Sequence, residues 1–257
     1  MKPGRVESYL HRKLKAEGSL HLTLIDPEKT APSQAAETAL KAEKAGSSAI
    51  LLGGSTIASQ TELEAVADAI KRRVEIPLIL FPGNVTGLSG RADAILFMSL
   101  LNSSNPYFLI GAQAIAAPMV RRLKLEAIPL GYIIMGQGGA AGYIGFARPI
   151  PFSKPSLAVA YALAGQYLGM RLIYLEAGSG AERAIPPEVV GAVKKALKVP
   201  LIVGGGIRNG ETAGSLVKAG ADIIVTGTVV EEAGGSEEKI REIVKAVRQA
   251  AGRRRQR

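Results

Sequence analysis

Two glycine-rich segments of the chain each follow a short apolar run and could bind a phosphate group. They are residues 204–208, Gly-Gly-Gly-Ile-Arg, and residues 226–228, Thr-Gly-Thr. Glycine has no Cβ atom, so backbone N–H groups can come close to phosphate oxygens, and a helix that begins just after the turn adds positive dipole character. Simple tight turning could use the same glycines, but two such turns favour a phosphate site.

A carboxylate ends a third apolar run. Glu176 closes the run Leu172–Glu176, and Gly178, Ser179 and Gly180 follow it. A carboxylate in this position can accept a proton from a hydroxyl group held nearby. Ser179 and the glycines can add hydrogen bonds to a polyol or to phosphate. The alternative is a glutamate that caps a neighbouring helix.

Oxygen ligands follow two runs near the start of the chain. Asp26 ends residues 21–26, and Ser55 follows residues 49–53. Carboxylate and hydroxyl oxygens suit Mg²⁺, which usually takes one or two protein ligands together with phosphate oxygens and water. If the two runs are adjacent strands, one ion could contact both. Asp-Pro is also a common turn sequence, so a structural role for Asp26 stays open.

The elements that must position these residues form a regular alternation. Eight apolar runs alternate with longer stretches rich in Ala, Glu and Lys. The runs are almost continuously apolar, as expected of parallel strands covered on both faces. Eight βα units in one chain favour a closed barrel, so we predict an α/β protein with a single (β/α)8 TIM barrel over residues 1–257. The predicted strands are 21–26, 49–53, 78–82, 94–99, 128–134, Leu172–Glu176, Leu201–Gly204 and 222–226.

Helices are predicted between the strands and ahead of the first. A leading helix, Arg5–Glu17, lies within residues 1–20, and Thr30 and Thr61 are the expected N-caps of the next two helices. The third βα unit has a short or absent helix, because residues 85–91 are too few for a full one. The remaining predicted helices are Pro32–Ala45, 61–73, 106–123, 155–168, 187–197, Gly210–Ala219 and 236–250.

Two segments depart from this alternation. Residues 136–155 contain five glycines before Phe146 and three prolines, and a loop of this length is usually functional or mobile. Residues 251–257 carry four arginines, and we expect a disordered basic tail. Contact of that tail with anionic lipid or RNA is the alternative.

Composition excludes several classes of protein. The chain contains no cysteine, so thiolate metal sites and cysteine nucleophiles are excluded. Lysine is absent from strands five to seven, which disfavours a Schiff-base aldolase, and both histidines lie away from the expected active face. The net charge of +10 is not accompanied by an RNA-binding motif, so no nucleic-acid partner is expected. No apolar run approaches the roughly 20 residues of a transmembrane helix. We expect a cytoplasmic protein with at most transient contact with a membrane surface.

Taken together, the motifs resemble those of the geranylgeranylglyceryl phosphate synthases, the archaeal ether-lipid prenyltransferases related to bacterial heptaprenylglyceryl phosphate synthases. The resemblance spans about residues 20–235. It implies transfer of a geranylgeranyl group from geranylgeranyl diphosphate to sn-glycerol 1-phosphate, with release of pyrophosphate. This reaction forms the first ether bond of archaeal membrane lipids. The residues that carry the resemblance are 24–29, 53–55, 102–107, 111–113, 174–180, 204–207 and 227–228.

The resemblance also implies roles for individual residues. Asp26 and Ser55 would bind Mg²⁺, and Glu176 would orient and deprotonate the attacking glycerol hydroxyl as the catalytic residue. A homo-oligomer, dimeric or hexameric, would be the assembled form. The aromatic residues Tyr107, Phe108, Tyr132, Tyr143 and Phe146 could line a groove for the prenyl chain. The implied glycerol phosphate contacts are Tyr174, Leu175, Glu176, Ala177, Gly178, Ser179, Gly180, Gly205, Gly206, Gly227 and Thr228.

One position departs from part of the family. Bacterial members and some archaeal ones carry a lysine two residues before the metal aspartate, whereas this chain has Leu24, which cannot pair with phosphate. Other archaeal members resemble this chain there, which favours the archaeal lipid substrate. The rival hypotheses are another phosphate-handling barrel, of thiamin- or histidine-pathway type, and a basic protein that binds RNA or a membrane surface.

Overall fold

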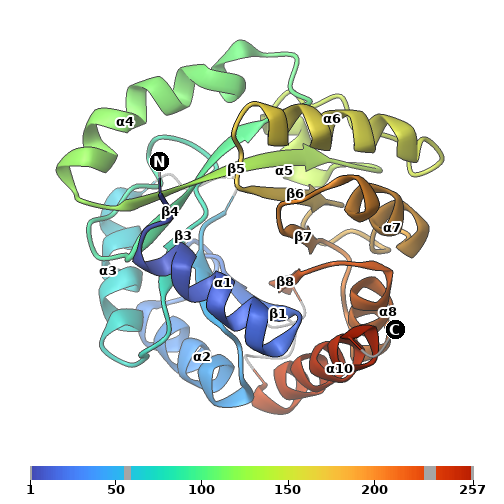
Figure 1. Cartoon of the computed structure of the whole chain (residues 1–257). Helices are drawn as coiled ribbons and strands as arrows, with labels where there is room; N and C mark the ends of the chain where they lie inside the picture. Colours follow the sequence, from blue (N-terminus) through green and yellow to red (C-terminus); the bar gives the residue numbers. More distant parts are fainter. Residues whose placement is uncertain (1, 55–58, 229–235, 256–257) are drawn as a thin grey trace.

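Eight parallel strands form a closed barrel, in which each strand pairs with the next and β8 pairs with β1 (Figure 1). The computed structural model describes residues 2–54, 59–228 and 236–255. The predicted (β/α)8 TIM barrel is confirmed, and each predicted strand lies within two residues of an observed one. The strands are β1 (Leu20–Ile25), β2 (Ala49–Leu52), β3 (Leu78–Leu80), β4 (Ala94–Leu100), β5 (Glu126–Ile134), β6 (Leu172–Glu176), β7 (Leu201–Gly204) and β8 (Ile223–Thr226).

Helices surround the barrel and connect most of its strands. Residues 81–93, all of them described, contain no helix between β3 and β4, which confirms the prediction for the third unit. The helix after β4 opens with one turn of π-helix, labelled η1. The helices are α1 (Arg5–Glu17), α2 (Pro32–Ala45), α3 (Gln60–Lys71), η1 (Tyr107–Gly111), α4 (Ala112–Arg122), α5 (Gly139–Ile144), α6 (Pro155–Tyr167), α7 (Pro187–Ala196), α8 (Gly210–Ala219) and α10 (Glu237–Arg255).

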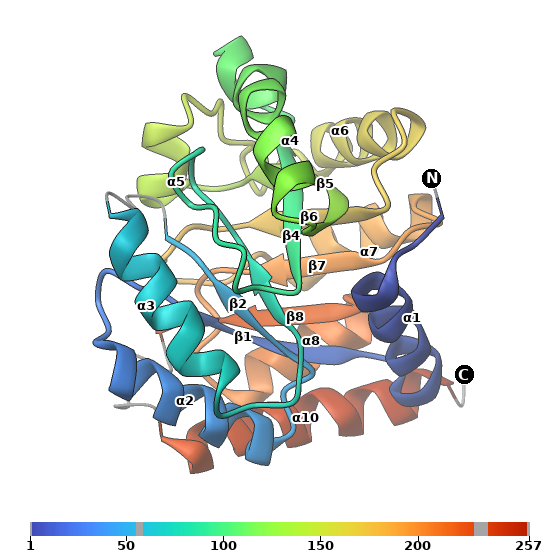
Figure 2. The same ribbon diagram turned by 90° about the vertical axis from the view of Figure 1, so that its left-hand side faces the viewer.

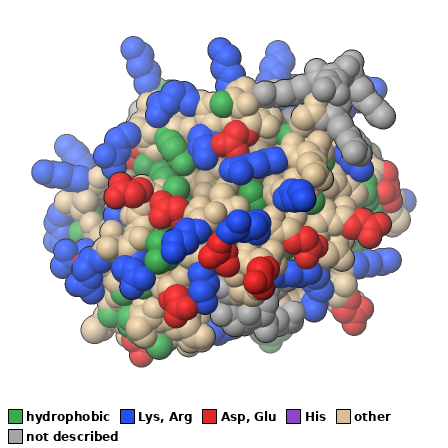
Figure 3. Space-filling view, turned by 90° about the horizontal axis from the view of Figure 1, so that it is seen from below, with side chains coloured by type: hydrophobic (Ala, Val, Ile, Leu, Met, Phe, Trp, Pro, Cys, Tyr) green, Lys and Arg blue, Asp and Glu red, His purple; other side chains and the backbone are tan. Residues whose placement is uncertain are grey.

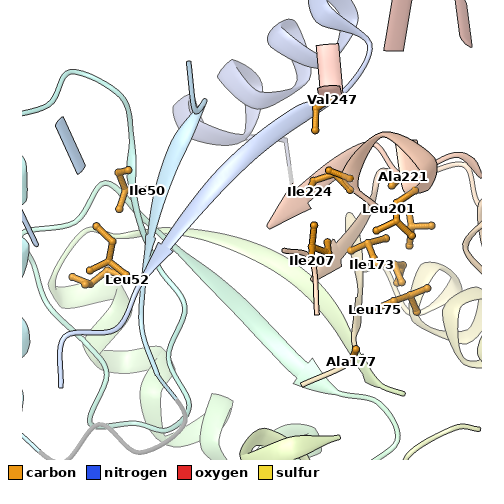
Figure 4. Close-up of a cluster of buried hydrophobic side chains, with 14 of the residues drawn as sticks. Ile50, Leu52, Ile173, Leu175, Ala177, Leu201, Ile207, Ala221, Ile224 and Val247 are labelled. Carbon is orange, nitrogen blue, oxygen red and sulfur yellow. The ribbon is translucent and has the colours of Figure 1, made fainter. Parts of the chain in front are cut away.

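Alternate residues of each strand face opposite sides of the barrel wall, because side chains alternate along a β-strand. On β6, Tyr174 packs in the cluster that fills the barrel interior. Leu175 and Ala177 pack in the layer between the strands and the outer helices, part of which Figure 4 shows. Glu176 has the same parity as Tyr174 and therefore points inward, toward the carboxyl ends of the strands.

Helix α1 closes the amino end of the barrel (Figures 1 and 2). Val6 and Leu10 pack against the interior cluster. The carboxylate of Glu126 accepts hydrogen bonds from the N–H groups of Val6 (2.7 Å) and Glu7 (2.9 Å). The buried Glu7 side chain pairs with Arg171 through two hydrogen bonds of 2.7 Å. The carboxyl end is therefore the end left for a site, and Figure 2 shows α5 there, opposite α1.

Two predicted N-caps were wrong. Helix α2 begins with Ala31 as its N-cap and Pro32 in its first turn, so Thr30 does not cap it. Helix α3 is capped by Ser59, whose Oγ accepts a hydrogen bond from the N–H of Glu62 (3.2 Å). Thr61 lies inside that helix. Ser59 and Glu62 have the same capping-box spacing as Thr61 and Glu64, so the local pattern allowed both starts.

The tail prediction was also wrong for most of its length. Residues 251–255 form the last turn of α10 instead of a disordered tail. The reason is burial: Ala250 and Ala251 are buried together with Ile243 and Val247 of the same helix, so the apolar stripe continues past the expected end. Residues 256 and 257 lie outside the described part of the chain.

Candidate active site

The carboxyl ends of the strands enclose a cavity of about 290 Å³. Most of the predicted site residues line it: Asp26, Tyr174, Glu176, Ser179, Gly180, Gly205, Gly206, Gly227 and Thr228. Leu175 and Ala177 do not, because their side chains face the outer helices. Ser55, the second predicted metal ligand, lies outside the described residues. The structure thus brings the phosphate turns, the carboxylate and Asp26 to one space.

Glu176 is buried at the inner wall of this cavity, with 7% of its surface exposed. Its Oε1 accepts a hydrogen bond of 2.6 Å from the N–H of Gly178, and the hydroxyls of Tyr132 and Tyr174 also donate to the carboxylate. Burial raises the pKa of Glu176 above its usual range, although these hydrogen bonds partly oppose the effect. The carboxylate bonds within the turn after β6 and does not cap a helix, so the capping alternative is wrong.

Three aromatic rings pack together inside the barrel, on the interior side of Glu176. Phe81 stacks on Tyr174 with ring centroids 5.4 Å apart, and Tyr132 meets both rings edge-on at 5.6 and 5.1 Å. Burial raises the pKa of both tyrosines well above the usual value of 10, so their hydroxyls stay protonated and act as donors. Phe81 was missed as a site residue, and Tyr132 was expected only in the prenyl groove. Tyr132 is at an inward-facing position of β5, and Phe81 is at one just after β3. This alternation of inward- and outward-facing positions is the signal that could have identified both residues.

The turn after β7 requires glycine at two successive positions. Gly205 and Gly206 have φ angles of +83° and +68°, which L-residues with a side chain rarely adopt. A Cβ atom on Gly205 would overlap the Glu176 carboxylate, and one on Gly206 would overlap the backbone of Arg183. The turn therefore presents bare backbone to the cavity immediately beside the carboxylate. Such concave backbone is suited to binding an anion.

Asp26 also lines the cavity, just after β1, the strand that pairs with β8. Its Oδ1 accepts a hydrogen bond from the N–H of Glu28 (3.1 Å), and its Oδ2 lies 3.4 Å from the Lys29 ammonium. Gly54 leaves space beside the carboxylate, because a Cβ atom there would lie 2.8 Å from Oδ1. The described residues hold no group of three or more acidic, histidine or cysteine ligands. A lone carboxylate with open space fits Mg²⁺, which completes its shell with phosphate oxygens and water.

The cavity extends into an apolar chamber between β4, η1 and α4. Its walls come from Val85, Leu88, Ile95, Met98, Phe108, Ala112, Ala116, Ala141 and Ile144. Val85 and Leu88 belong to the connection that lacks a helix, so the missing helix leaves this side to a short loop. Of the expected groove aromatics, Phe108 and Tyr132 line the cavity. Tyr143 and Phe146 point to the surface, 88% and 58% exposed, so their placement in the groove was wrong.

The long 136–155 connection forms one wall of the chamber. Buried Asn102 donates hydrogen bonds to the carbonyls of Ile134 (2.8 Å) and Arg148 (2.9 Å), and it accepts one from the N–H of Ile134 (3.1 Å). These bonds fix both ends of the segment that carries α5. A Cβ atom on Gly178 would lie 3.0 Å from the backbone N of Gly139, so α5 also packs on the turn after β6. The sequence allowed either a functional loop or a mobile insertion here, and these contacts with the cavity wall support a functional loop.

The fold and the cavity together define a class: a (β/α)8 barrel in which a buried carboxylate stands between a glycine turn and an apolar chamber. The chain belongs to the PcrB family, which it matches over residues 11–247.

Relatives of known name agree with this assignment. Geranylgeranylglyceryl phosphate synthase from Thermofilum pendens is 53% identical over 96% of this chain and 97% of the relative. The Pyrococcus furiosus protein of the same name is 57% identical over 93% and 94%. The crystal structure of (S)-3-O-geranylgeranylglyceryl phosphate synthase from Thermoplasma acidophilum, in complex with sn-glycerol-1-phosphate, superposes with a TM-score of 0.91. It is 40% identical and covers 97% of this chain and 100% of its own.

Proposed function

We propose that the protein is a prenyltransferase that joins geranylgeranyl diphosphate to sn-glycerol 1-phosphate and releases pyrophosphate. One observation carries the proposal: Glu176 lies in the same cavity as a phosphate turn on one side and an apolar chamber on the other. The names of the Thermofilum and Pyrococcus relatives and the ligand of the Thermoplasma structure support it. The product would be the first ether-linked intermediate of archaeal membrane lipids.

Glycerol 1-phosphate would bind across β6, β7 and β8. The phosphate would contact the backbone of Gly205, Gly206, Gly227 and Thr228, where the cavity wall has little side-chain bulk. The glycerol part would then lie against Tyr174, Glu176, Ser179 and Gly180. Leu175, Ala177 and Gly178, the other expected contacts, could contribute only through backbone atoms, because the first two side chains face away and glycine has none.

The reaction would be a substitution at the first carbon of the prenyl chain. Glu176 would accept the proton of the attacking glycerol hydroxyl, whose oxygen forms the ether bond as the carbon–oxygen bond to the diphosphate breaks. The raised pKa of Glu176 makes it a better proton acceptor than an ordinary carboxylate. The hydroxyls of Tyr132 and Tyr174 would hold the carboxylate toward the hydroxyl, while the apolar chamber receives the chain.

Magnesium dependence is part of the proposal. Asp26 would hold the ion together with the predicted ligand Ser55, and bound Mg²⁺ would neutralise charge on the departing diphosphate. The support is the Asp26 carboxylate, which lines the cavity beside Gly54 at the end of β1, the strand next to β8.

We also propose a homo-oligomer, a dimer or a hexamer, as the assembled form. Large apolar side chains are exposed on the neighbouring elements η1, α4, α5 and α6, and large exposed apolar patches mark interaction surfaces. They are Ile110, Ile115, Tyr143, Phe146, Leu157, Tyr161, Tyr167 and Leu168. A cytoplasmic location, with transient contact with membrane surfaces, remains the expectation for a protein that handles an amphiphilic substrate.

Two further surface features bear on partners. None of the helices within the described residues is long and apolar enough to cross a membrane. On the face at the bottom of Figure 1, Lys and Arg side chains stand out with Asp and Glu side chains among them (Figure 3). Such a mixture is typical of a solvated surface, and we propose no nucleic-acid partner.

The test is Glu176→Gln, which keeps the shape of the side chain and removes the base. Product formation from labelled glycerol 1-phosphate, Mg²⁺ and prenyl diphosphates of several lengths should fall about 10²- to 10⁴-fold in kcat, with folding intact. Exposed Glu188→Gln on α7 is the control and should stay at wild-type rate. If Glu176→Gln turned over at close to the wild-type rate, Glu176 would not be the general base of the reaction.

The wild-type protein supplies the test of the function itself. No product with any prenyl diphosphate would defeat the proposal, and activity without prenyl diphosphate would favour the rival phosphate-handling barrels. Glycerol 3-phosphate, as the mirror-image control, tests stereospecificity. Because burial raises the pKa of Glu176, the acid side of the pH–rate profile should turn down above the ordinary carboxyl range.

A further inference from the structure

Two basic side chains line the cavity, and they lie at different strand ends. Lys29 follows β1 and accompanies Asp26, whereas Arg208 follows β7 and continues the phosphate turn. Among the cavity residues that the structure describes, these two are the lysines and arginines. The internal segments outside the described residues, 55–58 and 229–235, contain neither residue type in the sequence.

The proposed reaction brings two anions into this space. A phosphate monoester carries close to two negative charges at neutral pH. The diphosphate is a second anion, and the oxygen that joins it to the prenyl carbon gains charge as the carbon–oxygen bond breaks. Leu24, which also lines the cavity, offers no charge to either of them. Arg208 continues the glycine turn after β7, whereas Lys29 contacts Asp26, the proposed magnesium ligand, and this contact is why Lys29 is assigned to the diphosphate.

The ion pair between Lys29 and Asp26 is open to solvent. The Lys29 ammonium lies 3.4 Å from Oδ2 of Asp26, and the two side chains are 54% and 13% exposed. Ion pairs this open to solvent contribute little to stability, so opening the pair costs little. Asp26 is also the carboxylate that fits a divalent cation. If Asp26 held such an ion, the Lys29 ammonium would be free to pair with diphosphate oxygens instead of with Asp26.

We propose that Lys29 is the counter-ion of the leaving diphosphate, paired with Asp26 in the free protein and transferred to diphosphate oxygens in the complex. This inference rests on the proposed function and adds one residue to it. Lys29 stays protonated throughout: the electron pair of the broken carbon–oxygen bond goes to the diphosphate, and the ammonium stabilises the charge that develops there. No covalent change occurs at Lys29.

The first experiment measures binding of inorganic pyrophosphate in the presence of Mg²⁺, by calorimetry with the full chain. Lys29→Gln should weaken pyrophosphate binding about 10- to 100-fold, the loss expected for a charge-assisted contact, and Lys29→Arg should restore most of it. Lys41→Gln is the matched control, since Lys41 pairs with Glu37 at 2.7 Å in the same way but lies on α2, away from the cavity lining. It should bind pyrophosphate like the wild type.

The second experiment separates the two substrates. Lys29→Gln should raise KM for the prenyl diphosphate and lower kcat, while the affinity for glycerol 1-phosphate and the unfolding temperature stay near wild type. Unchanged pyrophosphate affinity in Lys29→Gln, an equal loss in Lys41→Gln, or an equal loss of glycerol 1-phosphate affinity would each overturn the inference. The proposed function fails separately, through a wild-type protein that forms no product.

Discussion

Replacing Gly205 with alanine tests whether the phosphate turn and the proposed catalytic carboxylate share one space. Gly205 has a φ angle of +83°, and holding an L-residue with a side chain in this region costs about 1–2 kcal/mol. The added Cβ would also overlap the Glu176 carboxylate and lie 2.8 Å from the N of Gly178. The carboxylate must then move, and its 2.6 Å hydrogen bond from Gly178 is lost, at a further cost of about 1.5–3 kcal/mol.

The chain contains a matched control for the backbone part of this cost. Gly169, in the connection between α6 and β6, has a φ angle of +93°, and a Cβ atom there would meet nothing within 4 Å. Gly169→Ala should therefore lose only the backbone contribution, a drop in unfolding temperature of about 2–8 °C for a chain of this size. Gly205→Ala should lose this and the carboxylate contact, and kcat/KM should fall by at least about 100-fold because the base is displaced.

Two assays read these effects independently. Thermal unfolding followed by circular dichroism gives the stability of both variants, and incorporation of labelled glycerol 1-phosphate into extractable lipid gives turnover. Gly169→Ala should remain active at temperatures below its transition. The reasoning is refuted if Gly205→Ala unfolds at the same temperature as Gly169→Ala and turns over at a comparable rate, because Glu176 would then not occupy the space that the Cβ needs.

Two further perturbations probe structure around the site. His21 hydrogen-bonds to Ser47 (2.8 Å) and Thr226 (2.9 Å), and burial lowers its pKa from 6.5 to about 3. It stays neutral when folded but takes up a proton below pH 6.5 when unfolded, so it should reduce the free energy of unfolding by about 2 kcal/mol between pH 7 and pH 5. Denaturant titrations should show a shallower pH dependence for His21→Gln than for the wild type; equal slopes would contradict this. Asn102→Ala would remove the partner of the buried Ile134 backbone groups and of the part-buried Arg148 carbonyl, which should cost about 2 kcal/mol or more. The loss should hasten proteolysis within residues 136–155 and raise KM for the prenyl diphosphate. Unchanged proteolysis would show that the wall does not depend on Asn102.

Element positions followed closely from local patterns, while helix ends depended on packing. Pro32 and Gly46 bound α2, and the apolar run Leu201–Gly204 ends in the glycine turn, so both elements were predicted to the residue. The cap of α3 was not, because Ser59 and Thr61 offer the same chemistry and the path of the chain decides between them. The extension of α10 required knowing that its last apolar residues pack against the barrel.

Some residues of the candidate site could likewise be predicted from local sequence patterns, whereas others could not. Glu176 and Gly205 could be predicted, because their position at strand ends places them at the carboxyl end of any such barrel. The support from Phe81 depends on which rings meet inside the barrel, which is set by the stagger of the strands. The placement of Lys29 and Arg208 in one cavity likewise depends on barrel closure, which brings β1 and β7 within reach of a single ligand pair.

The helix that seals the amino end of the barrel closes that end as a route to the cavity. Val6 and Leu10 of α1 fill the space through which a second exit could pass, and the ion pair of Glu7 with Arg171 anchors the seal. In the proposed reaction, substrates and products would therefore not pass through the amino end. The order in which the two substrates bind and the two products leave at the carboxyl end would then be part of the kinetics.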